Sequence, residues 1–107
     1  MKQETFLKIL SDQGFPAPIF VVREKGGFIN PQSLPFEVLA LVLDGQIDIV
    51  VASIKNVYLA GDTFYLAPNQ MHAQNFGSKG VKYLASRKGV VLQEELGLEH
   101  PNTQEAA

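Results

Sequence analysis

The sequence predicts an all-β domain that begins with one short α-helix. From about residue 18 onwards, runs rich in Val, Ile, Phe and Tyr are separated by turn residues about every 8 to 12 residues, which is typical of antiparallel sheets. The chain has 107 residues, of which 46% are hydrophobic, enough for one buried core but not for two. We therefore expect a single domain over residues 1–107.

The segment 5–13 has the period of an amphipathic helix. Phe6, Ile9, Leu10 and Gln13 recur at three- and four-residue steps, and a glycine follows as a helix stop. An apolar face of this kind is stable when it covers another apolar surface. We expect the helix over residues 5–13 to pack across one end or one face of the β-structure.

Seven runs after the helix have the composition of strands. They cover residues 18–24, 36–43, 46–52, 57–60, 63–67, 71–75 and 81–87. Asp44-Gly45 is the strongest hairpin signal between them, because a two-residue turn needs the positive φ angles that Asp and Gly tolerate. The composition of residues 90–92 allows one further strand, and we expect residues 93–107 to form a loosely held polar tail.

The run 36–43 is apolar at nearly every position apart from Glu37. Such a run indicates a strand that is buried on both faces, so we expect it to lie centrally. Three structures can cover its outer side, namely a second sheet, the N-terminal helix or another subunit.

Charge and composition exclude several classes of protein. Nine Lys and Arg against eleven Asp and Glu give a formal charge of −2, so the chain has no basic field for a phosphate backbone, and we expect no nucleic-acid partner. No uncharged apolar stretch approaches the roughly 18 residues of a membrane span. We therefore expect a cytoplasmic protein with no membrane partner. The absence of cysteine excludes disulfides, thiolate nucleophiles and Cys-based metal sites, so a metal would need His, carboxylate or amide ligands.

Residues 61–72 carry a spaced motif. Gly61 is followed by an apolar strand, then by Pro68 and His72. This order resembles the second motif of the cupin superfamily, and in particular of its small single-domain bacterial members. Pro68 lies one position later than in the family, and Asn69 or Gln70 stands where a glycine is usual.

The first cupin motif is kept only in its glycines. Counted from Gly26, the two histidine positions of that motif fall on Gln32 and Leu34. Counted back from Gly45, the glutamate position falls on Val38. The glycine spacing therefore resembles the family, while three of the four metal-ligand positions hold residues of other chemistry.

The resemblance implies a cupin-type double-stranded β-helix, that is, a jelly-roll barrel over about residues 18–92, with the site at its mouth. In metal-bound members, imidazoles and a carboxylate bind iron, manganese, zinc or nickel. Leu34 has no lone pair and Gln32 offers only a neutral oxygen, so we expect no metal and no other cofactor. The alternative is one divalent metal, Zn, Ni, Fe or Mn, held by His72, Gln32 and Glu37. Glu37 would then need a bulge, because one step along a strand turns a side chain to the opposite face.

We expect one ligand pocket at the barrel mouth. Its predicted lining residues are His72, Gln32, Leu34, Val38, Gln74 and Tyr65. Gln74 lies two positions from His72 and so shares its face of the strand. Tyr65 points to the other face from its two neighbours in the sequence, and ordinary packing is the simplest explanation for its ring.

Two classes of function compete at this point. The first is a non-enzymatic cupin that holds a small organic molecule in an apolar pocket or forms a dimeric scaffold. The second is an enzyme, either a metal-dependent oxygenase or isomerase with unusual ligands around His72, or a metal-free enzyme that uses His72. We favour the first class, with no catalytic residue, and expect a homodimer, because the apolar residues 19–22 also need covering.

Overall fold

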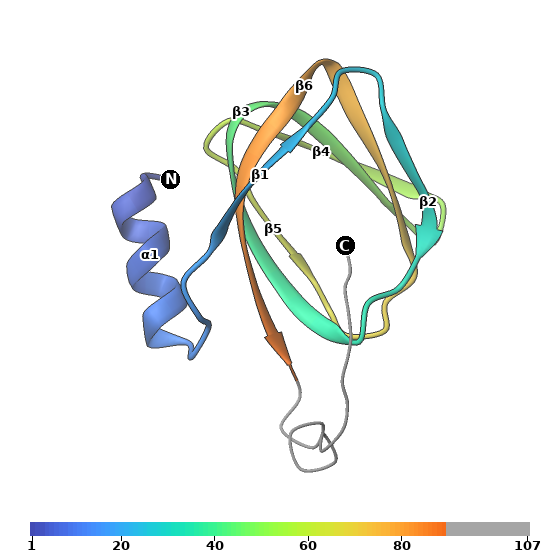
Figure 1. The fold of residues 1–107 in the computed structure, drawn as a ribbon. Helices are drawn as coiled ribbons and strands as arrows, with labels where there is room; N and C mark the ends of the chain where they lie inside the picture. Colours follow the sequence, from blue (N-terminus) through green and yellow to red (C-terminus); the bar gives the residue numbers. More distant parts are fainter. Residues whose placement is uncertain (90–107) are drawn as a thin grey trace.

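The computed structural model describes residues 1–89, which form one helix and a six-stranded antiparallel sheet (Figure 1). The elements are α1 (Gln3–Asp12), β1 (Ile19–Arg23), β2 (Phe28–Gln32), β3 (Phe36–Val51), β4 (Ile54–Leu59), β5 (Thr63–Leu66) and β6 (His72–Gly89). The predicted all-β fold with one N-terminal helix is therefore confirmed. The predicted strand at 90–92 and the polar tail at 93–107 lie outside the described residues.

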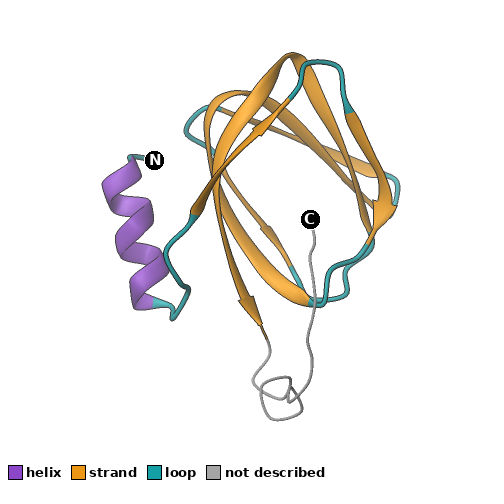
Figure 2. Cartoon of the chain, viewed as in Figure 1, coloured by secondary structure: helices purple, strands orange, loops and turns teal. Residues whose placement is uncertain are grey.

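The two long strands β3 and β6 hold the fold together. β6 pairs with β1, β2 and β3, and β3 pairs with β4, β5 and β6, always antiparallel. Both long strands bend strongly, so that the sheet curls around an interior while α1 lies outside it (Figure 2). This curvature brings the side chains of alternate residues from five strands into one enclosed space.

The predicted hairpin at Asp44-Gly45 is wrong. Both residues lie inside the continuous strand β3, at a point where its register with β6 shifts. Gly45 has a φ of 85°, and a Cβ there would lie 2.9 Å from the Cα of Val81 and closer still to the carbonyl oxygen of Gly80. A bulge that bends a long strand and a tight turn both need a residue with positive φ, so their local sequence signals are the same.

A tight turn at Ala52-Ser53 joins β3 to β4 in a hairpin. Val51 pairs with Ile54 across it, and the two turn residues have φ angles of 51° and 67°. These angles are those of the turn that joins two antiparallel strands through two residues. The predicted strands 46–52 and 57–60 leave residues 53–56 between them, so β4 begins three residues earlier than predicted, at Ile54.

Strand β2 was not predicted, since Asn30-Pro31 has the composition of a turn. β2 pairs only with β6, and its register shifts between Ile29 and Gln32. A proline has no N–H to donate, but it is tolerated at the edge of a sheet or at such an irregularity. The two predicted strands at 71–75 and 81–87 are likewise one continuous strand, β6, in which Gly80 has a φ of 76°.

Two hydrophobic clusters form the core. The larger fills the barrel interior and is built from buried residues of β3, β5 and β6, with Val21 of β1 packed against it. In the smaller cluster, Phe6 and Leu10 of α1 pack with Phe15 against Leu41 of β3 and Leu84 of β6. Of the three structures that could cover the outer side of β3, the helix is the one that does so. None of the helices in residues 1–89 is long and apolar enough to cross a membrane.

Candidate functional site

A small cavity of about 40 Å³ lies inside the barrel. It is lined by Val21, Arg23, Ile29, Gln32, Leu34, Val38, Phe64, Leu66, Gln74, Tyr83, Ala85 and Arg87. Four residues predicted for the pocket, Gln32, Leu34, Val38 and Gln74, thus share one cavity although they come from different parts of the chain. Whether they bind a ligand stays a prediction.

His72 is 2% exposed and is not itself in the cavity lining, but it borders the lining through its contact with Gln74. Its Nδ1 lies 3.0 Å from the carbonyl oxygen of Gln70, and its Nε2 lies 3.3 Å from Nε2 of Gln74. A carbonyl can only accept, so Nδ1 carries the proton, and the lone pair of Nε2 accepts from the Gln74 amide. The imidazole is therefore held on both sides by the protein itself.

This hydrogen bond also fixes the orientation of the Gln74 amide. Because its nitrogen donates to His72, its oxygen Oε1 points elsewhere, and Oε1 is buried with no hydrogen-bond partner among the described residues. A buried acceptor without a donor costs about 1–3 kcal/mol. The site therefore contains one polar atom that is ready to accept from a group inside the cavity.

Gln32 lies directly across the β2–β6 pair from His72. Leu34 follows in the connection to β3, where its carbonyl accepts from the Asn69 N–H at 2.6 Å. Val38 lies on β3, is 6% exposed and belongs to the barrel core. The backbone thus presents positions 32, 34 and 38 to the same interior.

Tyr65 and Glu37 do not lie with the other site residues. The Tyr65 hydroxyl donates to Oε1 of Glu37 at 3.0 Å, and the tyrosine is 51% exposed, whereas Phe64 and Leu66 point into the core. The hydrogen bond to the Glu37 carboxylate, with smaller effects of burial and charge, raises the pKa of Tyr65 above its usual value. Glu37 also lies 3.7 Å from Nζ of Lys88, so it is engaged away from the cavity.

Two arginines that sequence reasoning missed line the cavity. Arg23 ends β1 and lies two positions after Val21, which is also in the lining, and Arg87 lies two positions after Ala85 on β6. Side chains at i and i+2 lie on the same face of a strand. An arginine two positions from a residue expected to be buried therefore indicated that these side chains face the interior. The Arg87 guanidinium carbon lies 5.5 Å from the centre of the Phe36 ring.

These residues do not fit a transition metal. Leu34 and Val38 offer no donor atom, Glu37 is bound to Tyr65, and the one free lone pair of His72 accepts from Gln74. Within residues 1–89, no three His, Asp or Glu side chains lie together as a metal would require. The chemistry that the cavity offers is hydrogen bonding by amides and guanidinium groups beside an apolar wall.

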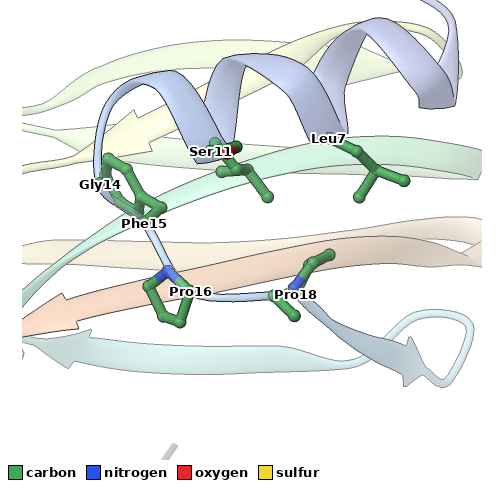
Figure 3. Close-up of a pocket in the computed structure, with 8 residues that line it drawn as sticks. Leu7, Ser11, Gly14, Phe15, Pro16 and Pro18 are labelled. Carbon is green, nitrogen blue, oxygen red and sulfur yellow. The ribbon is translucent and has the colours of Figure 1, made fainter.

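A second hollow lies outside the barrel. It is an open groove of about 550 Å³ between α1 and the segment that leads into β1, lined by Leu7, Leu10, Ser11, Gly14, Phe15, Pro16, Ala17 and Pro18 (Figure 3). No titratable side chain lines it, so it offers an apolar surface but no acid–base or ligating group.

The chain was compared with protein-family models, curated sequences and solved structures. No model of a protein family matches the chain, and no curated protein sequence matches it. Solved structures do match. A cupin superfamily protein of Desulfitobacterium hafniense is 18% identical, with a TM-score of 0.60 over 66% of this chain and 64% of that one. The chain has the cupin fold.

Other solved cupins agree with this assignment. An RmlC-like cupin of Shewanella frigidimarina is 18% identical, with a TM-score of 0.57 over 65% of this chain and 63% of that chain. The Cnp3 cupin domain of Schizosaccharomyces pombe is 12% identical, with a TM-score of 0.64 over 77% of this chain and 68% of that chain. The matched region is thus slightly less than two thirds of the first two proteins. At these identities the likeness establishes the fold, and function has to come from the site.

Proposed function

We propose that this cupin domain binds a small organic molecule inside its barrel, without a metal and without catalysing a reaction. The observation that carries the proposal is the cavity at positions 32, 34 and 38, where apolar side chains lie beside the half-buried amide of Gln32 and the buried amide of Gln74, whose oxygen has no hydrogen-bond partner in residues 1–89. An apolar wall with a few convergent polar groups is the usual composition of a small-molecule site. The buried histidine of the described part of the chain, His72, is held on both ring nitrogens, which leaves it no lone pair to act as a base.

Metal analysis separates this proposal from a metal-dependent enzyme. We expect purified protein to contain far less than one equivalent of iron, zinc, nickel or manganese per chain, because two of the ligand positions have no donor atom. The measurement is elemental mass spectrometry on wild type and on His72→Ala, with circular dichroism to show that both are folded. About one metal per chain in wild type, lost in the variant, would overturn the proposal.

Ligand binding itself is tested by thermal denaturation. A molecule that binds only the folded state raises the melting temperature. We expect at least one class in a panel of small acids, amines, alcohols and sugars to do so in protein that has been treated with a chelator. If no class of compound shifts the melting temperature, the barrel is not a binding site.

A dimeric scaffold is a second candidate, favoured by the outer face of β1. Phe20 and Val22 on this face are 58% and 56% exposed, and β1 is an edge strand with unpaired backbone groups. Pro18, directly before β1, lines the apolar groove beside α1 (Figure 3). Two copies of an antiparallel edge pair naturally around a twofold axis, so a second copy of this chain fits the surface.

Light scattering tests the dimer. We expect a dimer mass for wild type at micromolar concentration and a monomer for Val22→Glu, which puts a charge on the exposed face opposite Lys82 and leaves the fold intact. The matched control is Val57→Lys on the other edge strand, opposite Asp48, which should stay dimeric. A monomer mass for wild type, or dissociation by the control alone, would contradict pairing through β1.

A further inference from the structure

We propose that the ligand of the barrel cavity is a short hydroxy acid, bound as its anion, with glycolate as the simplest example. This inference rests on the proposed binding function and names its ligand class. It comes from two buried polar atoms that have no hydrogen-bond partner within residues 1–89, one a donor and one an acceptor.

The donor is Nε of Arg23. This atom is buried and has no hydrogen-bond partner among the described residues, and no Asp or Glu of residues 1–89 forms an ion pair with Arg23. The guanidinium carbon lies 6.0 Å from the centre of the Phe76 ring, which supports the planar group from one face. A planar cation with an unused N–H is the usual partner of a carboxylate.

The charge of the cavity lining agrees with an anion. Arg23 is among its twelve residues, and none of the twelve is an aspartate or a glutamate. Removing the Arg23 cation from water costs free energy unless a negative group compensates it. A carboxylate inside the cavity would supply that negative group, whereas an amine would meet a cation.

The acceptor is Oε1 of Gln74. A carboxylate cannot satisfy it, because an ionised carboxylate has no proton to donate. The ligand therefore needs a hydroxyl group as well, close enough to its carboxylate for both to fit one cavity. The amide of Gln32 lines the same space and offers a further donor to the ligand.

Size selects a short molecule. The cavity has about 40 Å³, and one ordered water needs roughly 10–15 Å³ of such space. Room for only a few water-sized groups suits an acid of two carbons, while a sugar or a tricarboxylic acid is too large. A two-carbon acid with one hydroxyl combines both required functions.

Binding of sodium glycolate, sodium acetate and ethylene glycol tests this inference, measured by calorimetry and thermal denaturation at constant ionic strength. Acetate lacks the hydroxyl group and ethylene glycol lacks the charge. We expect glycolate to bind wild type at least tenfold more tightly than acetate, and ethylene glycol not to bind. In Gln74→Leu, glycolate should lose its advantage over acetate.

Charge variants complete the test. Arg23→Gln should weaken glycolate at least tenfold, and Arg23→Lys, which keeps the charge but loses the planar fork, should fall between the two. Lys82→Gln removes the same charge from the exposed outer face of β6 and should bind as wild type does.

Equal binding of ethylene glycol and glycolate, or glycolate binding that Arg23→Gln and Arg23→Lys leave unchanged, overturns the inference. If only neutral compounds bind, the ligand class is wrong and the binding function stands; if nothing binds, both fail.

Discussion

Replacing Gly45 with alanine is expected to destabilise the barrel by about 3–5 kcal/mol. Two costs add at this position. A residue with a side chain at a φ of 85° costs about 1–2 kcal/mol, and the new methyl group would press on the backbone of Gly80 and Val81, which cannot rotate away. The free energy of unfolding, measured with chemical denaturant, checks the size of the loss.

Gly26→Ala is the matched control for this prediction. Gly26 also has a positive φ, of 68°, but a Cβ built there meets no atom within 4 Å. Its substitution should therefore cost only the conformational part, about 1–2 kcal/mol. If both variants lose the same stability, the close approach of β3 and β6 at Gly45 does not constrain the fold, and our explanation of the bulge is wrong.

The triple variant Gln32→His, Leu34→His and Val38→Glu is expected to acquire a metal site. All three positions line the cavity that His72 borders through Gln74, so the change would place three imidazoles and a carboxylate around one space. Without metal the variant should be less stable than wild type by several kcal/mol, because a buried carboxylate without a partner is poorly tolerated. Added zinc or nickel at 100 times its dissociation constant should restore about 2.7 kcal/mol.

Calorimetry with and without metal tests both parts of this prediction. Adding His72→Ala to the triple variant removes one ligand and should reduce the metal-dependent rise in melting temperature. Adding Gln74→Ala instead releases Nε2 of His72 and should increase it. A folded triple variant with no metal-dependent rise would show that the four positions do not converge, and that the alignment of Gly26 and Gly45 with the first cupin motif is wrong.

Local patterns in the chain predicted most of the elements of the fold. The three- and four-residue steps of Phe6 and Leu10 predicted α1 within two residues at its start and one at its end. The distance from Gly61 to His72, together with the spacing of Gly26 and Gly45, indicated the cupin barrel and the positions that share its interior. Such patterns are readable because helix and strand periods decide which side chains share a face.

Site residues could be predicted only at the positions that the spacing of the cupin motifs indicates. Positions 32, 34, 38 and 74 line one cavity as expected, but Arg23 and Arg87 were not singled out, and Tyr65 lies outside with Glu37. An arginine at a strand position reads as a solvent-exposed residue until the partner strands are known. Which cavity it borders depends on the pairing of β1 with β6, which links residues about 60 positions apart.

By itself, then, the sequence determined the fold class, the helix and most strand positions, because these depend on residue type and on spacing within a segment. Tertiary structure alone decided that Gly45 bends a continuous strand instead of closing a hairpin, that α1 covers β3, and that Arg23 and Gln74, which each have a buried atom without a partner in residues 1–89, line the same cavity. Those features depend on which segments, far apart in the sequence, pack together. A residue with positive φ fits a bulge or a turn, and an apolar face can pack against several surfaces, so neither signal identifies the partner segment.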